Sequence, residues 1–385
     1  MCKFNSGTRH TLTMLLIMSS LNIYSKAQTT PSDKITLLFI GDIMGHKQQI
    51  LSAEDRVNRT YNYDSVFTYI KPAIAEADIA IANFEVILAG PPYSGYPVFN
   101  SPASLAVACK NAGIDCLVTA NNHSADRSSK GIKGTIINLD SLGITHTGTF
   151  MNSEERDRLY PLIIKKNEFS IAILNYTYGT NGVEVRKPFI VNSIDKKIIS
   201  EDIEKARSKS AGIIIVFLHW GKEYSSTPLQ EQYDLSEFIF EEGGDIIIGS
   251  HPHVLQKMIW IKDDPEKGKG RLTAYSLGNF VSDQRKPKTE GGAMVRIEIK
   301  KKDQASFITN ADYYLTWVYT PVEKYRKRFF VIPCSEYENK PTFFSSPEHY
   351  NRMKKFMNES RSLLYSQNSN FYEMIYNGSS WLLSF

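Results

Sequence analysis

Five short polar clusters in the sequence could carry chemistry, and each of them follows an apolar run. Together they offer carboxylate, amide and imidazole groups, and five of the eight histidines lie in or beside them. Nitrogen ligands favour transition metals, so this set of groups suits Zn, Mn or Fe better than Ca or Mg. The clusters are Gly41-Asp42, Asn83-Phe84-Glu85, Asn121-Asn122-His123, His219-Trp220-Gly221 and Gly249-Ser250-His251-Pro252-His253.

Each cluster alone has an ordinary structural explanation. Gly-Asp after a strand commonly forms a turn, Asn-Asn-His can close a hydrogen-bonded loop, and a single histidine can be a satisfied core residue. Their shared position favours a common site, because the carboxyl ends of strands in an open α/β sheet form the crevice where ligands bind. His251 and His253 are two residues apart, so each could bind a different ion.

The elements that must position these clusters are indicated by apolar, β-branched runs that alternate with amphipathic segments from Ile35 to about Gly249. This pattern predicts an α/β domain whose strands are buried on both faces. Strands are expected at 35–40, 79–82, 116–119, 171–175, 213–218 and 246–248, and helices at 65–76, 102–112, 131–142, 194–208 and 229–242. From about Arg271 strands follow one another, and a last helix is expected near 347–364. Tyr313–Trp317 is expected to be a strand, with a cleft-lining role as the alternative.

In these clusters and the segments around them, the chain resembles the CapA/PgsA-type poly-γ-glutamate capsule-synthesis proteins. Those proteins in turn resemble calcineurin-like metallophosphoesterases. The resemblance implies a layered α/β/β/α sandwich over 34–300, with a strand-rich C-terminal extension over 301–385 that completes or caps it. The matching segments run in order from about Lys34 to Val281. They are Gly41–Met44, Asn83–Glu85, Ala120–His123 with Asp126 and Gly131, His219–Tyr224, Gly249–Val254 and Tyr275–Phe280.

The resemblance also implies a site for two divalent transition-metal ions, such as Mn, Zn or Fe, which could activate a hydroxide and hold an oxygen of the substrate. Asp42 and His253 would bind the first ion, and Glu85 would bridge the two ions. The ligands of the second ion would be Asn122, His219 and His251.

By the same resemblance, His123 would be the imidazole that binds no metal and can protonate a leaving group. Asp126 either hydrogen-bonds His123 and sets its tautomer, or caps the helix that begins near Ser128. The segment 275–280 is expected to be a strand that ends under the site. Three further residues are predicted to support the ligands or to contact substrate: Glu223 and Tyr224, which orient His219 or shape the cleft, and Asn279.

One departure from the metallophosphoesterase pattern concerns the first ion. That pattern has a histidine two positions after the first aspartate, where this chain has Met44. A thioether is a poor ligand for a hard or borderline ion, so the first site is expected to bind its ion weakly. His46 could reach this ion from the following turn, but a surface or supporting position is expected for it.

The first residues are typical of an export signal. Lys3 and Arg9 precede an apolar run over 12–24, and Ser25-Lys26-Ala27 supplies small residues for a signal peptidase. We therefore predict a cleavable signal peptide at 1–27 and a periplasmic or cell-surface location, with an uncleaved membrane anchor as the alternative. Export permits disulfides, yet only three cysteines would remain. They are expected to be buried apolar residues, with a Cys109–Cys116 pair as the alternative.

The charge of the chain gives no indication of nucleic-acid binding. The formal net charge is +4, but the first 27 residues carry three bases and no acid, which leaves 42 bases against 41 acids. The expected partners are an anionic polymer or a phosphoester substrate, with an envelope complex as a further one. Three functions stay open: metal-assisted hydrolysis or transfer on a poly-γ-glutamate-like chain, phosphoester hydrolysis, and a non-catalytic scaffold that retains the site.

Overall fold

The structure is a computed structural model that describes Met1 and residues 33–263, 270–302 and 305–384. Apart from Met1, the predicted signal peptide lies outside the described residues. Within the ranges that are described, no helix is both long and apolar enough to cross a membrane.

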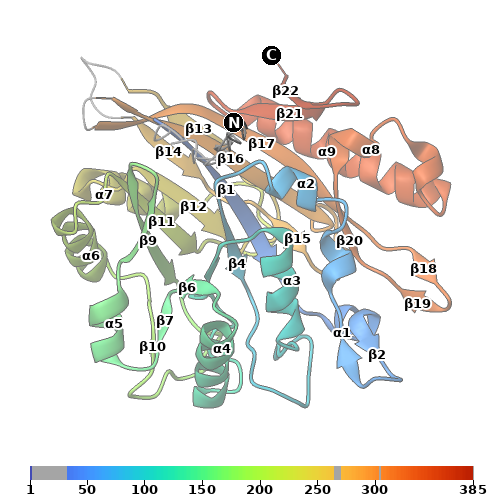
Figure 1. Ribbon diagram of the computed structural model, residues 1–385, viewed down its shortest axis with the longest axis horizontal. Coiled ribbons are helices and arrows are strands. Elements are labelled where there is room, and N and C mark those ends of the chain that lie inside the picture. Colours follow the sequence, from blue (N-terminus) through green and yellow to red (C-terminus); the bar gives the residue numbers. More distant parts are fainter. Residues whose placement is uncertain (2–32, 264–269, 303–304, 385) are drawn as a thin grey trace.

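Two large sheets form the centre of the molecule (Figure 1). The larger sheet has the order β22-β21-β17-β16-β1-β4-β5-β6, with β15 beside β1 and β20 beside β17. Its β1, β4, β5 and β6 run parallel, whereas β16 pairs antiparallel with β1. The strands are β1 (Lys34–Ile43), β4 (Ile79–Phe84), β5 (Cys116–Val118), β6 (Thr145–Thr147), β15 (Asn279–Val281), β16 (Gly291–Lys302), β17 (Ala305–Tyr319), β20 (Phe330–Pro333), β21 (Tyr372–Tyr376) and β22 (Trp381–Leu383).

The six-stranded sheet has the order β13-β14-β12-β11-β9-β8. Its β9, β11, β12 and β14 run parallel, so their carboxyl ends lie at one edge. Its strands are β8 (Leu162–Lys166), β9 (Phe169–Thr177), β11 (Ile213–His219), β12 (Ile246–Ser250), β13 (Met258–Ile261) and β14 (Arg271–Ala274).

Alternate residues of each central strand face different apolar layers, as the pleat of a strand requires. In β1, Leu37 and Phe39 enter a core shared with the six-stranded sheet, where Phe39 lies 6.4 Å from Phe217 between ring centres. Leu38 and Ile40 face the other way, toward a core that the helix α3 covers. Truncating Phe39 or Phe217 to alanine is expected to lower the free energy of unfolding by about 3–5 kcal/mol.

Helices cover the outer face of each sheet (Figure 1). On the larger sheet they include α3, and on the six-stranded sheet α6 and α7 bury their apolar sides. The predicted α/β/β/α layering is therefore confirmed. The helices are α1 (Lys47–Ala53), η1 (Asp64–Phe67), α2 (Lys71–Ile74), α3 (Ser104–Ala112), α4 (Ser129–Ser141), α5 (Ser153–Leu159), α6 (Lys196–Ser208), α7 (Gln230–Glu242), α8 (Cys334–Tyr337), η2 (Pro341–Phe343) and α9 (Pro347–Gln367).

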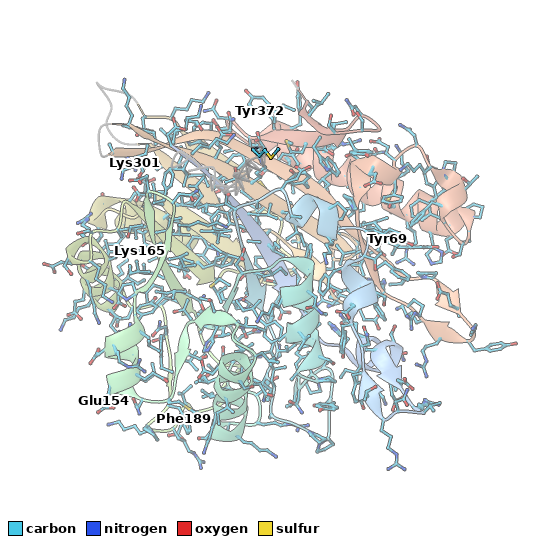
Figure 2. All side chains as sticks on the ribbon, in the orientation of Figure 1. Tyr69, Glu154, Lys165, Phe189, Lys301 and Tyr372 are labelled. Carbon is cyan, nitrogen blue, oxygen red and sulfur yellow. The ribbon has the colours of Figure 1, made fainter. Side chains whose placement is uncertain are left out.

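The C-terminal strands extend the larger sheet, because β17 pairs with β16 along most of its length. Tyr313–Trp317 lies in β17, so its prediction as a strand is confirmed. Tyr69, labelled in Figure 2, contacts Phe330, Tyr337 and Phe343 edge-on at 5.2–5.8 Å between ring centres. These contacts tie the first helices of the chain to its last third.

Two predicted elements differ from the structure. The helix expected at 65–76 is divided into η1 and α2, because Pro72 has no backbone N–H to continue a helix into α2. The strand expected at 275–280 is present only at its end, where Asn279 and Phe280 begin β15. Gly278 has φ +67, a conformation that breaks a strand, and the chain passes there from β14 of one sheet to β15 of the other.

This crossing segment joins the two sheets where they approach each other. The Leu277 amide donates to the Gly249 carbonyl at 3.1 Å, and the Asp42 amide donates to the Gly278 carbonyl at 3.1 Å. It therefore fixes the end of β12 relative to the end of β1. The three cysteines outside the first 27 residues, Cys109, Cys116 and Cys334, are buried free thiols, as expected, and the alternative pair does not form.

Candidate metal centre

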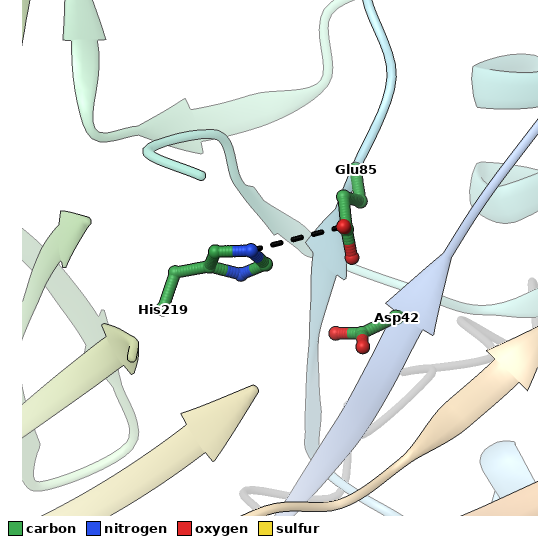
Figure 3. A group of neighbouring side chains, drawn as sticks. All are labelled: Asp42, Glu85 and His219. Carbon is green, nitrogen blue, oxygen red and sulfur yellow. Dashed lines mark ion pairs between the residues drawn. The ribbon is translucent and has the colours of Figure 1, made fainter. Parts of the chain in front are cut away.

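The ends of strands from both sheets bring three predicted ligands together. Asp42 lies near the end of β1, after a bulge, Glu85 follows β4, and His219 ends β11. All three side chains are fully buried and point toward one another (Figure 3). One ligand atom from each lies within 4.8 Å of the other two. The predicted meeting of carboxylate and imidazole at the strand ends is therefore present.

Glu85 is the central carboxylate of this group. Its Oε1 is buried without a hydrogen-bond partner, 3.7 Å from His219 Nε2 and 3.9 Å from His253 Nε2. Burial, and after it the nearby Asp42 carboxylate, raises the pKa of Glu85 well above its ordinary value. Within the described ranges, Asp42 and Glu85 form ion pairs only with histidines. A buried carboxylate without a fixed cation is costly, so a divalent ion fits this position.

The residues predicted to bind the second ion, Asn122, His219 and His251, lie close together. Asn122 Oδ1 lies 2.9 Å from His219 Nε2, and ligands of one ion with bonds of 2.0–2.2 Å are about 3.0–3.5 Å apart. The His251 ring lies 4.8 Å from the His219 ring, and His251 Nδ1 is buried without a partner. His251 has φ +97, a strained backbone conformation that the surrounding structure must hold.

These imidazoles are neutral, which is the form that binds metals. Burial, followed by the neighbouring His251 and His253, lowers the pKa of His219 well below its ordinary value. Burial, followed by His253 and His123, lowers the pKa of His251 to about 3.

The side of the first ion is more fully hydrogen-bonded within the protein. His253 Nδ1 lies 3.0 Å from Asp42 Oδ2 and 3.1 Å from Asn279 Oδ1, and Asn83 donates to Asp42 Oδ1 at 2.8 Å. Met44, at the position where the metallophosphoesterase pattern has a histidine, is buried. This side therefore offers fewer free ligand atoms than the other.

His46 has the supporting position that was expected for it. It precedes α1, where its Nδ1 lies 3.2 Å from Gln49 Oε1 and accepts a hydrogen bond from the Asp283 amide at 3.3 Å. Its ring contacts Phe99 edge-on. His46 thus packs beside the first-ion side without replacing the missing ligand.

His123 and Asp126 form a buried pair, with His123 Nδ1 2.9 Å from Asp126 Oδ2. Asp126 Oδ2 also accepts a hydrogen bond from the Phe99 amide at 2.6 Å. Helix α4 begins after Ser128 without a side-chain cap, so of the two alternatives for Asp126 the structure has the contact with His123. The catalytic role of the pair stays a prediction.

Glu223 and Tyr224 are exposed residues. The His219 ring is instead held by Ser250, whose Oγ lies 3.0 Å from His219 Nδ1. The Tyr224 ring lies 6.0 Å from the His253 ring, and its amide donates to the Pro252 carbonyl at 2.8 Å. That Glu223 and Tyr224 shape a cleft stays a prediction.

Of the two alternatives for Asn279, support of a ligand fits the structure better than contact with a substrate. Asn279 is fully buried, and its Nδ2 donates to Gln284 Oε1 at 3.0 Å and to the Thr289 carbonyl at 2.9 Å. Its Oδ1 faces His253. Asn279 therefore supports a predicted ligand.

Sequence reasoning missed four residues that hold the ligands. Asn83 and Ser250 lie within the recognised motifs, but only neighbouring residues were predicted as ligands. Asn181 Oδ1 accepts a hydrogen bond from Asn122 Nδ2 at 3.3 Å, which turns the amide oxygen of Asn122 toward His219. The Tyr178 ring stacks on His219 at an interplanar angle of 9°. Tyr178 and Asn181 follow β9, whose end carries no recognisable motif.

Comparison with known proteins adds to this geometry. Residues 36–284, well over half of the chain, match the family model of the bacterial capsule synthesis protein PGA_cap. The chain belongs to this family. It is 29% identical over 286 residues to the capsule biosynthesis protein CapA of Bacillus anthracis, which covers 71% of this chain and 66% of that protein, slightly less than two thirds of its length. It is also 29% identical over 293 residues to the PGA biosynthesis protein CapA of Bacillus subtilis, with 73% and 72% covered.

Among solved structures, the PGA_cap chain has distant likenesses. The calcineurin-like phosphoesterase YfkN of Bacillus subtilis gives a TM-score of 0.45 at 13% identity and covers 86% of this chain and 98% of that one. The NAD nucleotidase NadN of Haemophilus influenzae gives a TM-score of 0.45 at 12% identity and covers 86% of this chain and 60% of that one.

Proposed function

We propose that this PGA_cap chain is an exported enzyme of capsule or anionic-polymer biosynthesis, which performs metal-assisted hydrolysis or transfer on a polymer of the poly-γ-glutamate type. Family membership and the name of the Bacillus subtilis relative support the process. Glu85 carries the chemical part, because its buried, unpartnered Oε1 lies between His219 and His253.

Two divalent transition-metal ions fit the donor set and, when bound, would supply Lewis-acid chemistry. Asp42 and His253 would hold one ion, and Glu85 would be shared. The residues that would hold the other ion are Asn122, His219 and His251.

The remaining residues position the ligands and the proton. Asp126 engages Nδ1 of His123, which leaves Nε2 as the nitrogen that holds a proton for a leaving group. Asn181 fixes the amide of Asn122, and Ser250 fixes the ring of His219. These two ligands are thus oriented before substrate arrives.

The direct test is incubation of the Mn-loaded mature protein with poly-γ-glutamate, followed by measurement of polymer length. We expect a change of length that requires metal and is lost in His123→Ala, and a deletion strain with an altered capsule. No binding of the polymer, together with an unchanged capsule, would overturn the proposal.

A phosphoesterase activity is the second candidate, supported by the combination of a two-ion donor set with a non-ligand imidazole. A screen of phosphomonoesters and phosphodiesters with Mn or Zn decides it. Turnover of a diester without any change in the polymer would favour this candidate, whereas no turnover by metal-loaded protein would exclude it.

A non-catalytic scaffold in an envelope complex is the third candidate, and Met44 at the missing ligand position supports it. It predicts that His123→Ala restores the capsule of a deletion strain as well as the wild type does. Catalysis predicts no restoration by that variant, so one complementation experiment separates the two.

Export is proposed from the first 27 residues. Mass spectrometry of the protein recovered from the periplasm or cell surface should find a chain that begins at Gln28. Recovery of a chain that still contains Lys3 and Arg9 would instead support a membrane anchor.

A further inference from the structure

A basic loop lies beside the first-ion side of the candidate metal centre. It runs from Gln284 to Thr289 and includes three basic side chains. Asn279, whose Oδ1 lies 3.1 Å from His253 Nδ1, donates from its Nδ2 to the Gln284 side chain and to the Thr289 carbonyl. One buried amide therefore holds both ends of the loop and a predicted metal ligand together.

The three basic side chains of the loop have different surroundings. Arg285 is largely buried, and burial lowers its pKa. Lys288 lines a small cavity with Glu359 of α9. Lys286 is exposed, and its Nζ lies 3.8 Å from the centre of the Tyr224 ring. Within the ranges that the structure describes, no carboxylate forms an ion pair with Lys286.

Tyr224 connects this ammonium group to the metal centre. Its backbone is fixed by the hydrogen bond to Pro252 and has φ +64, and its ring lies 6.0 Å from the His253 ring. Its hydroxyl contacts the Glu223 carboxylate. One aromatic ring thus separates the Lys286 ammonium from the His253 imidazole.

We propose that Lys286, held over Tyr224, binds a second negative charge of the substrate, next along the molecule from the group at the metal centre. The substrate class is then a molecule with at least two oxyanion groups, carboxylates or phosphates. A fixed ammonium gives a charge-assisted contact, and its position over the ring reduces the freedom that it loses on binding. This inference rests on the proposed function, because it specifies the substrate of the same site.

The test measures the binding of a γ-linked glutamate trimer, tripolyphosphate and inorganic phosphate to the Mn-loaded mature protein by calorimetry. Lys286→Gln should lower the affinity for both polyanions about tenfold, because one charge-assisted contact is lost. It should change the affinity for inorganic phosphate less than about twofold. Lys286→Arg should retain most of the affinity. Lys288→Gln removes the same charge from the same loop and should leave all three affinities unchanged. The polyanion that binds more tightly identifies the distal group as carboxylate or phosphate.

Equal losses in Lys286→Gln and Lys288→Gln, an unchanged affinity in Lys286→Gln, or no binding of either polyanion would overturn the inference. A repeat with metal-free protein separates it from the proposed function. If the tenfold loss persists there while no metal ever binds, the subsite stands and the metal chemistry fails. If metal and phosphate bind normally and Lys286→Gln has no effect, only the subsite fails.

Discussion

Two groups of carboxylates in this protein differ in what neutralises them. In the C-terminal part, Arg361 donates to Glu338 at 2.7 and 2.8 Å and to Glu373 at 2.8 and 2.9 Å. Lys354 adds a further contact to Glu338 at 2.7 Å. In the metal centre, Asp42 and Glu85 form ion pairs, among the residues that the structure describes, only with histidines.

The pKa values of Glu338 and Glu85 follow this difference, whereas burial raises the pKa of Glu373 although Arg361 contacts it. Hydrogen bonds from Arg361, with the help of Lys354, lower the pKa of Glu338 to about 2. Burial and a second carboxylate raise the pKa of Glu85 well above its ordinary value. Where the chain supplies its own cations, the carboxylates stabilise the fold. Where it supplies none, we propose that the carboxylates bind a cation from outside.

The largest expected effect is on catalysis at the metal centre. His123→Ala should reduce the metal-dependent turnover at least about 100-fold, because the proton held by the imidazole is lost. Metal content and the urea midpoint should stay close to those of the wild type. Turnover within a factor of about three of the wild type, at full metal content, would show that His123 holds no essential proton.

The next effect concerns stability at the C-terminal group. Arg361→Met should lower the free energy of unfolding by about 3 kcal/mol, because it leaves Glu338 and Glu373 without their shared cation. Urea unfolding measures this effect. The control is Lys197→Met, which breaks an exposed pair with Glu201 and should cost less than about 0.5 kcal/mol. Similar losses in the two variants, or a loss of metal from Arg361→Met, would remove the contrast between the two groups.

A smaller effect is expected from pH. The folded pKa of Glu338 is below that of the unfolded chain, so its stabilisation is complete above about pH 4.5 and is lost as the pH falls toward 2. Glu338→Gln should therefore lower the free energy of unfolding by about 1 kcal/mol at neutral pH, after allowance for solvent screening, and approach the wild type near pH 2. Unfolding curves of both proteins between pH 2 and 7 measure the difference. A difference that is independent of pH would contradict the ion-pair explanation.

Sequence alone predicted the central strands and most of the site, because these strands are continuous apolar runs that end in polar residues. The runs that lead to Asp42, His219 and His253 show this directly. Because these strands are buried on both faces, their continuous apolar runs can be recognised without knowledge of the tertiary structure. The layering also followed, because strands of this kind require helices on both outer sides.

The remaining features depend on contacts between distant segments. Tyr178 and Asn181 follow a strand without a motif, and only the packing of the two sheets brings them to His219 and Asn122. The group around Arg361 joins acids 23 and 12 residues away, at spacings that resemble ordinary surface charges. The prediction of a strand at 275–280 is correct only at its end, because a local apolar pattern does not show that the chain changes sheets there.

The most direct test of the account is the number of Mn ions bound per chain by the wild type and by Glu85→Gln, measured by elemental analysis and calorimetry, with Glu338→Gln as the matched control. We predict two ions for the wild type, one held more weakly, the same for the control, and a loss of both tight binding and stoichiometry in Glu85→Gln. Equal metal content in Glu85→Gln and the wild type, or a wild type that binds no metal, would contradict it.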